Sequence, residues 1–316
     1  MSHAGVNASD HRNDWLFKML VAALAWSAFA LLLGAALTMA WGGREVFARF
    51  GFGFVTGQVW DPVMGEYGAL AAIYGTLVTS AIALLLAVPI GFGIALFLTE
   101  LAPSWIRAWV GTAIELLAGI PSIIYGMWGI FVLVPLLGEH VYPWIDGNLG
   151  TLPIIGPLFR GPPIGVGFLT AGVVLAIMVL PFITAIMRDV FLTVPQRLKE
   201  SAYALGSTTF EVVWDIVLPY TRGAVVGGIF LGLGRALGET MAVTFVIGST
   251  YQITAAMLEP GHSITAVIAN EFAEADPGMH RSALVALGFV LFVVSFVVLL
   301  LAKLMLRKLN RDAGTL

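Results

Sequence analysis

The sequence contains no cysteine and few charged residues. Without cysteine it cannot build thiolate zinc sites, disulfide frameworks, CxxC redox motifs or covalent haem attachment sites. Asp, Glu, Lys and Arg make up 11% of the 316 residues, against about 25% in an ordinary globular domain. The net charge of −3 provides neither a basic stripe for nucleic acid nor an acidic tail. These absences exclude a soluble globular domain and a nucleic-acid-binding protein.

Long apolar runs dominate the sequence instead. Hydrophobic residues make up 59% of it, and the mean hydropathy is +0.93. A bilayer core about 30 Å thick requires a helix of about 20 apolar residues. Six stretches qualify: 16–40, 69–98, 108–137, 166–187, 223–249 and 283–306. The first is too long for a signal-peptide core. We therefore predict an all-α polytopic membrane protein with six transmembrane helices.

The basic residues predict the orientation, because Lys and Arg accumulate in cytoplasmic loops. With a cytoplasmic N-terminus, eleven of the sixteen basic residues fall on the cytoplasmic side and four on the outer side, while Arg235 lies inside a span. Both termini are therefore predicted to be cytoplasmic. The predicted parts are an N-terminal tail over 1–15, a six-helix membrane domain over 16–308 and a C-terminal tail over 309–316. Outer connections are expected over 41–68, 138–165 and 250–282.

The motifs of the common ATPases and hydrolases are missing from the sequence. It has no Walker P-loop, no HExxH helix and no GxSxG elbow. The five histidines lie outside the expected spans without metal-ligand spacing, and His140, His262 and His280 are expected to be solvated in the outer loops. We therefore predict a protein that is not an enzyme and that holds no metal or cofactor of its own.

A cytoplasmic segment over 189–221 is predicted to contain two short helices. Pro195 suits the first turn of a helix, and Gly206 suits a C-terminal cap. Thr208 and Glu211 have the spacing of a capping box at the start of the second helix, which Pro219 is expected to end. On this local pattern alone, an amphipathic hairpin lying on the membrane fits equally well.

Two stretches place polar groups inside the membrane. Arg235 and Glu239 are four residues apart in the expected fifth span, so they are predicted to share a helix face and to pair. Such a pair either fixes helix packing or belongs to a substrate path, where the planar guanidinium suits an oxyanion. In the expected third span, Pro121 should kink the helix and free a carbonyl beside the hydroxyls of Ser122 and Tyr125. Packing alone would also explain that kink.

Two sets of residues resemble the signatures of a known family. The first set has the spacing of the EAA loop of ABC-importer permeases, with a serine in the first alanine position: Glu200, Ser201, Ala202, Gly206, Ile216, Leu218 and Pro219. The second set, GIPSIIYG at 119–126 and RALGETMA at 235–242, resembles the permease subunits of phosphate ABC importers. The resemblance covers residues 68–306 approximately. It implies the fold of the type I ABC importer permeases.

That resemblance also implies a function. The chain would move inorganic phosphate into the cytoplasm across a bacterial inner membrane and would perform no chemistry itself. The EAA residues would dock on an ATPase subunit that binds ATP and Mg, and the substrate path would include Arg235, Glu239, Ser122 and Tyr125. The implied partners are a second, PstA-like permease subunit, two PstB-like ATPase subunits and a PstS-like phosphate-binding protein.

Three alternatives remain open at this point. An importer permease for another oxyanion, such as molybdate or sulfate, would keep the EAA loop. A secondary transporter would use Arg235 and Glu239 as an ion relay and would work without ATP. A sensory or scaffold membrane protein would bind the ATPase but support no flux.

Overall fold

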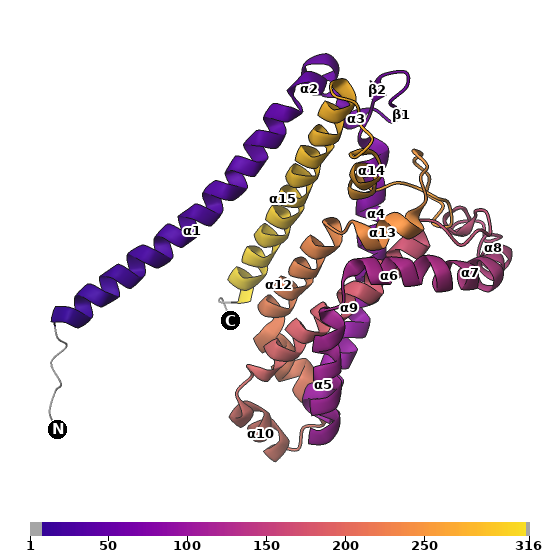
Figure 1. The fold of residues 1–316 in the computed structure, drawn as a ribbon. Coiled ribbons are helices and arrows are strands. Elements are labelled where there is room, and N and C mark those ends of the chain that lie inside the picture. The colour runs from indigo at the N-terminus through magenta and orange to yellow at the C-terminus, as the bar shows by residue number, and fades with distance from the viewer. Residues whose placement is uncertain (1–7, 314–316) are drawn as a thin grey trace.

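The computed structural model describes residues 8–313, which form helices, short loops and one small β-hairpin (Figure 1). Four π-helical segments (η1, η2, η3 and η5) and one 3₁₀ turn (η4) interrupt or join the α-helices. In chain order the elements are α1 (Ala8–Gly42), α2 (Arg44–Phe50), α3 (Gly53–Thr56), β1 (Trp60–Asp61), β2 (Glu66–Tyr67), α4 (Leu70–Leu96), η1 (Phe97–Leu101), α5 (Ser104–Ala118), α6 (Ser122–Trp128), η2 (Gly129–Leu133), α7 (Val134–Leu136), η3 (Leu137–Val141), α8 (Tyr142–Asn148), η4 (Gly156–Phe159), α9 (Phe168–Leu192), α10 (Gln196–Ala204), α11 (Thr209–Val212), η5 (Val213–Val217), α12 (Leu218–Leu237), α13 (Met241–Ile247), α14 (Ile264–Glu271) and α15 (Met279–Ala313).

Within residues 8–313, six helical segments are long and apolar enough to cross a membrane, which confirms the predicted all-α fold and its number of spans. They are Asn13–Gly42, Leu70–Leu101, Ser122–Asn148, Phe168–Leu192, Thr209–Leu237 and Met279–Arg307. The first, second, fourth and sixth overlap the predicted spans, since each is one uninterrupted apolar run. The predicted tails lie partly outside the described residues, and α1 and α15 extend into the parts of them that are described.

The third span begins later than the sequence predicted. The stretch expected to start it is a separate helix, α5, whose 15 residues fall short of the roughly 20 that a crossing requires. α5 ends before Pro121, because proline has no N–H with which to continue the helix. The span then runs from Ser122 to Asn148, so the first part of the expected outer loop is helical. Figure 1 shows α6, α7 and α8 as an arm that extends from the packed helices.

The fifth span begins and ends earlier than predicted. Pro219 does not end the second cytoplasmic helix, because α11, η5 and α12 form one continuous helix through it. The π-helical turn Val213–Val217 ends two residues before Pro219 and changes the hydrogen-bonding register where proline cannot donate. At the other end α12 stops at Leu237, and Met241–Ile247 forms the separate helix α13. The segment 189–221 therefore becomes part of the fifth span from Thr209 onward.

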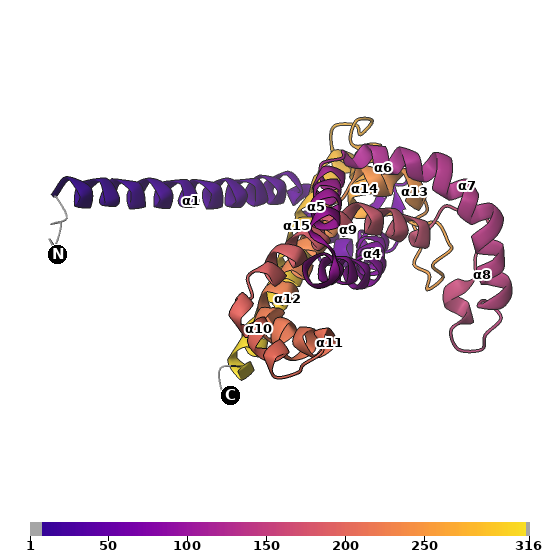
Figure 2. The same cartoon turned by 90° about the horizontal axis from the view of Figure 1, so that it is seen from below.

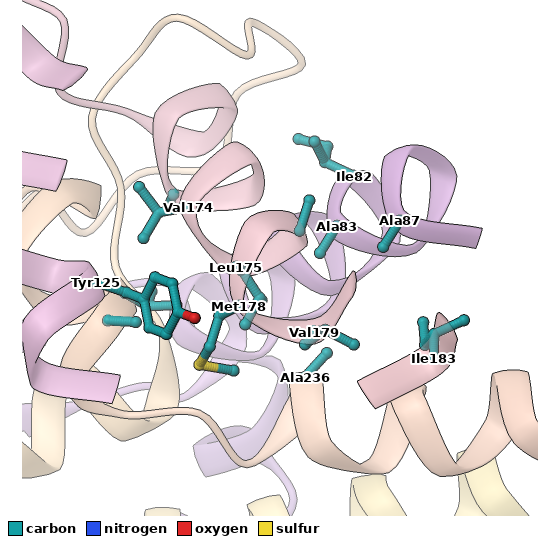
Figure 3. Close-up of a cluster of buried hydrophobic side chains, with 14 of the residues drawn as sticks. Ile82, Ala83, Ala87, Tyr125, Val174, Leu175, Met178, Val179, Ile183 and Ala236 are labelled. Atoms are coloured by element: carbon teal, nitrogen blue, oxygen red, sulfur yellow. The ribbon is translucent and has the colours of Figure 1, made fainter. Parts of the chain in front are cut away.

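The helices α4 and α9 form the centre of the molecule. A Cβ atom at Gly91 of α4 would lie 3.0 Å from Thr184 Oγ1 of α9, and one at Gly172 of α9 would overlap Ile82. The helices α5, α12, α13 and α6 pack around this pair. Figure 3 shows part of the resulting apolar cluster, to which α4, α6, α9 and α12 all contribute side chains.

The first helix lies apart from this centre. In Figures 1 and 2, α1 extends away from the other helices over most of its length. It contacts α15 and α2, and Gly42 and Gly43 at its end meet Val285 and Ala286 of α15. Its apolar side chains are largely exposed, as at Leu31, which is 75% exposed. This helix therefore offers apolar surface to lipid or to another membrane protein.

Candidate substrate path and coupling segment

The break between α5 and α6 is built around Pro121. Proline at this position cannot donate to the carbonyl of Leu117, four residues earlier. The Leu117 carbonyl accepts a hydrogen bond from the Tyr125 hydroxyl at 2.9 Å and a second one from the Ile120 N–H at 3.2 Å. The sequence correctly predicted that Pro121 frees a carbonyl. The structure adds that the hydroxyl of the buried Tyr125 donates to this carbonyl and so connects α6 to α5.

A second break separates α12 from α13 and overturns the predicted pairing of Arg235 with Glu239. Arg235 lies in the last turn of α12, while Glu239 lies beyond its end. The Glu239 carboxylate accepts a hydrogen bond from the Ala242 N–H at 3.3 Å, in the first turn of α13. Its main-chain carbonyl accepts one from the Thr265 hydroxyl at 2.7 Å. Glu239 therefore holds the break in place instead of neutralising Arg235.

The two breaks come together because α6 packs against α13. Gly126 makes this approach possible: a Cβ atom there would lie 2.8 Å from the main-chain oxygen of Met241 and 2.7 Å from the ring of Phe245. In Figure 3 the Tyr125 ring lies beside Met178 of α9, in the same cluster as Ala236 of α12. The stretches 119–126 and 235–242, distant in sequence, thus form one region. Ser122, half-buried in the first turn of α6, belongs to it.

Arg235 is the charged group of this region. Its guanidinium carbon lies 5.6 Å from the ring centre of Phe182 on α9, a geometry in which cations are attracted to aromatic faces. The residue is exposed in the isolated chain. Among residues 13–307, whose side chains the structure describes, no carboxylate forms an ion pair with it. The arrangement therefore leaves a cationic group of a membrane span available to an anion.

The coupling segment forms a short helix, α10, followed by a tight turn. Pro195 precedes the helix, and Gly206 follows it with φ +92°, a backbone angle that favours glycine. The predicted capping box is confirmed, since the Thr208 hydroxyl accepts from the Glu211 N–H while the Glu211 carboxylate accepts from the Thr208 N–H. These local signals were strong enough to be read from the sequence.

The EAA residues divide into an exposed group and a packed group. Glu200, Ser201, Gly206 and Pro219 are exposed. Ala202 and Ile216 pack against the central apolar cluster, and Leu218 lines an apolar groove beside Phe92 of α4. Leu205, at the end of α10, is 88% exposed. Glu200, Ser201 and Gly206, with this uncovered leucine, leave the surface of α10 and its turn open to another protein. The packed group ties the segment to the membrane helices.

One contact of α10 was not predicted from the sequence. Lys199 Nζ lies 2.5 Å from Glu100 Oε1 at the end of η1, and both side chains are buried. Lys199 is buried, whereas its neighbour Glu200 is exposed. No local pattern marks this pair, because its members are 99 residues apart.

A cluster around Glu271 was also missed by the sequence-based prediction. The Glu271 carboxylate accepts hydrogen bonds from Trp60 Nε1 at 3.0 Å and from the Tyr251 hydroxyl, and it pairs with His280 at 2.8 Å. Burial and the neighbouring carboxylate raise the pKa of Tyr251. The cluster joins the β-hairpin, the loop after α13, α14 and α15.

The histidine predictions were wrong for two of the three positions. His262 is buried and stacks on Tyr251 with ring centres 4.7 Å apart, and burial lowers its pKa to about 4. His280 is also largely covered, with its side chain 19% exposed. His140 is exposed as expected, although it lies on the helical arm. His262 lies in the loop that packs on Tyr251 before α14, and His280 lies in the first turn of α15, where it pairs with Glu271.

Six spans, a cytoplasmic segment with EAA spacing and a helix break beside an arginine define a permease of a binding-protein-dependent importer. Residues 87–311 match the family described as binding-protein-dependent transport system inner membrane component. A chain of a bacterial alginate ABC transporter, crystallised with its alginate-bound periplasmic protein, shares this fold. The TM-score is 0.61 at 20% identity, over 95% of this chain and 97% of that chain.

Relatives of higher identity identify the family within this class. The chain is 60% identical, over 98% of its length, to the phosphate transport system permease protein PstC of Xylella fastidiosa (strain 9a5c), of which it covers 95%. It is 53% identical to PstC of Pasteurella multocida (strain Pm70), over 96% of this chain and 95% of that one. The chain belongs to the PstC family of phosphate transport system permeases. It is a non-catalytic, multi-pass inner membrane subunit of an ABC transporter complex that includes ATPase subunits and a binding protein.

Proposed function

We propose that this chain carries inorganic phosphate into the cytoplasm as a permease subunit of an ATP-driven importer, and that Arg235 binds the anion. The position of Arg235 is the observation that supports this site best. It lies in a membrane span, at the end of α12. Within residues 13–307 it forms no ion pair with a carboxylate, because Glu239 is engaged by α13.

Electrostatics explains why this position suits phosphate. An arginine without an anionic partner is unfavourable within a membrane span. A phosphate ion would offset that cost, and its oxygens match the planar fork of the guanidinium. We place Arg235 on the substrate path with Glu239, which holds its helix break. Ser122 and Tyr125 complete the path from the facing break.

The same proposal assigns the coupling residues. Glu200, Ser201 and Gly206 present the exposed surface of α10 and its turn to an ATPase subunit, which binds the ATP and Mg. Ala202 and Ile216 pass the contact to the membrane helices, because both pack on the central cluster. Leu218 and Pro219 belong to the first turn of α12, within the fifth span that continues from the coupling segment.

We further propose the composition of the complex. It would contain this chain, a PstA-like second permease subunit, two PstB-like ATPase subunits and a PstS-like phosphate-binding protein at the outer face. The exposed apolar surface of α1 supports a second membrane subunit, since a helix that makes few contacts within its own chain is available to a neighbour. Both termini would lie in the cytoplasm.

Uptake of radiolabelled phosphate into vesicles tests the proposal. The complete complex would be reconstituted with the wild-type chain, with Arg235→Ala, or with Arg222→Ala as a control on the exposed cytoplasmic end of the same helix. We expect wild-type uptake to require ATP and to resist excess sulfate and molybdate. Loss of a charge-assisted contact should lower the uptake of Arg235→Ala about ten-fold or more, with Arg222→Ala near wild type.

Other results of this experiment would select the alternatives. Uptake that continues without ATP would indicate a secondary transporter. An assembled complex that moves sulfate or molybdate but no phosphate would indicate a permease for another oxyanion. An assembled complex without flux of any of these anions would indicate a sensory or scaffold protein.

Gly206→Pro tests the coupling segment. Proline cannot adopt the φ of +92° that Gly206 has, so the turn between α10 and α11 should be distorted while the spans remain intact. We expect a chain that inserts normally but in which ATP hydrolysis no longer drives uptake. Insertion is checked by membrane fractionation, and hydrolysis and uptake are measured in the same vesicles. Unchanged uptake would exclude the assignment.

A further inference from the structure

The buried contact between α10 and the second span has an unusual position. Lys199 Nζ and Glu100 Oε1 lie 2.5 Å apart, and their side chains are 8% and 6% exposed. Glu100 belongs to η1, which continues α4 without a break from Leu70 to Leu101. The pair thus connects the short cytoplasmic helix to one end of a helix that crosses the membrane.

The ion pair between α10 and η1 lies beside a cavity and next to a well-anchored helix end. A polar cavity of about 520 Å³ lies beside it, lined by Thr99, Arg107 and Gln196 among others. Residues of both α10 and η1 line this cavity. The end of η1 is itself held firmly, because the Arg107 guanidinium donates to the main-chain oxygens of Thr99 at 3.0 Å and of Ala102 at 3.4 Å.

The pair also connects the two surfaces that coupling requires. Glu200, the next residue after Lys199, is exposed on the proposed ATPase-facing side of α10. At the other end of the link, α4 packs along α9, and α9 carries Phe182 beneath Arg235. A displacement of α10 would therefore reach α4 through two buried charges, and through α4 it would reach α9, which contacts Arg235.

We propose that the Lys199–Glu100 ion pair is the strut that transmits movement of α10 to α4, so that both are positioning residues for coupling. This inference rests on the proposed function, in which an ATPase subunit moves α10. A buried ion pair suits such a link, because its members cannot separate without leaving uncompensated buried charges. The two elements must therefore move together.

The experiment measures phosphate imported per ATP hydrolysed in vesicles that contain the complete complex. Lys199→Met removes the charge and keeps the length of the side chain, and Lys199→Arg keeps the charge. The double variant Glu100→Lys/Lys199→Glu reverses the pair. Lys303→Met, at an exposed lysine on α15, is the matched control. The amount of ATPase subunit that copurifies with each variant reports assembly.

We expect Lys199→Met to assemble and to hydrolyse ATP, with a transport ratio lowered about five-fold or more, the usual range for a coupling interaction. Lys199→Arg and the reversed pair should recover most of the ratio, and Lys303→Met should keep it. A normal ratio for Lys199→Met, or a reduced amount of complex with a normal ratio per complex, would overturn the strut. A wild-type complex that imports no phosphate with ATP would instead overturn the proposed function.

Discussion

At the scale of single residues, Tyr125 shows how a helix break is stabilised. Pro121 leaves the Leu117 carbonyl without its usual helical partner, and the Tyr125 hydroxyl donates to that oxygen at 2.9 Å. The tyrosine is 9% exposed, so water replaces this bond poorly. The hydroxyl thus has a structural role that the sequence motif alone did not reveal.

Tyr125→Phe removes this hydrogen bond and leaves the ring in place. We expect the chain to lose about 1 kcal/mol of stability, the usual contribution of a hydrogen bond to a partly buried carbonyl. Thermal unfolding of the purified complex measures the change, with Tyr220→Phe as a control, because Tyr220 is 56% exposed. Equal melting temperatures for the two variants would contradict the structural role of the hydroxyl.

His262 is the second informative residue, because it is buried as a neutral ring. Burial lowers its pKa to about 4, from a usual 6.5. Since the folded pKa lies below the unfolded one, the unfolded chain binds the proton more readily. The contribution of His262 to stability is therefore complete above about pH 6.5 and decreases as the pH falls toward 4.

His262→Phe should remove this acid dependence while keeping the stacking on Tyr251. Between pH 7.5 and pH 5 the free energy of unfolding of the wild type should fall by about 2 kcal/mol more than that of the variant. The reason is that each pH unit between the unfolded and folded pKa values lowers it by about 1.4 kcal/mol. Melting curves of the purified complex at both pH values test this, with the exposed His140→Gln as control. A wild type and a His262→Phe variant with the same pH dependence would rule out the linkage.

At the scale of elements, the two helix breaks decide where the candidate site forms. The sequence-based prediction misplaced spans three and five, because the sequence stays apolar across both helix breaks. The helices end there because the backbone hydrogen bonding is interrupted, which composition does not show. The pairing of Arg235 with Glu239 failed for the same reason: four residues share a face only on an unbroken helix. The capping box at Thr208 and the turn at Gly206 were predictable, since a few neighbouring residues determine them.

Gly126→Ala tests the contact between α6 and α13. An added Cβ would lie 2.8 Å from the Met241 carbonyl oxygen, so the helices must separate, at a cost of about 1–3 kcal/mol for overpacking. We expect a lower melting temperature and reduced phosphate uptake. Gly227→Ala in α12, where a Cβ would meet nothing within 4 Å in this chain, should leave both unchanged. Full uptake by Gly126→Ala would show that this close approach is dispensable.

At the scale of the whole molecule, the orientation follows from charge and is open to direct measurement. The chain has no cysteine, so single introduced cysteines have no background. Val63, in the hairpin, is 92% exposed, and Leu205, after α10, is 88% exposed. The two positions are predicted to face opposite sides of the membrane.

An impermeant maleimide reagent should label Val63→Cys in intact cells and Leu205→Cys only after permeabilisation. The chain would be expressed without its partners, so that no ATPase subunit covers α10. The reverse labelling pattern would invert the orientation and would place the coupling segment outside the cytoplasm. Each variant is the control for the other, because Val63→Cys reports on one side of the membrane and Leu205→Cys on the other.

The sequence by itself determined the class of protein, the number of spans and the local structure of the coupling segment, and it predicts the orientation from the basic residues. These properties depend on composition and on short spacings, which neighbouring residues set. Tertiary structure decided that the Tyr125 hydroxyl donates to the Leu117 carbonyl and that Lys199 pairs with Glu100. It also decided that Glu239 bonds to α13, which leaves Arg235 without an ion pair within residues 13–307. Each of these contacts depends on where a helix ends or on residues far apart in the chain, because burial and the demand of buried polar groups for partners act only once the helices have packed.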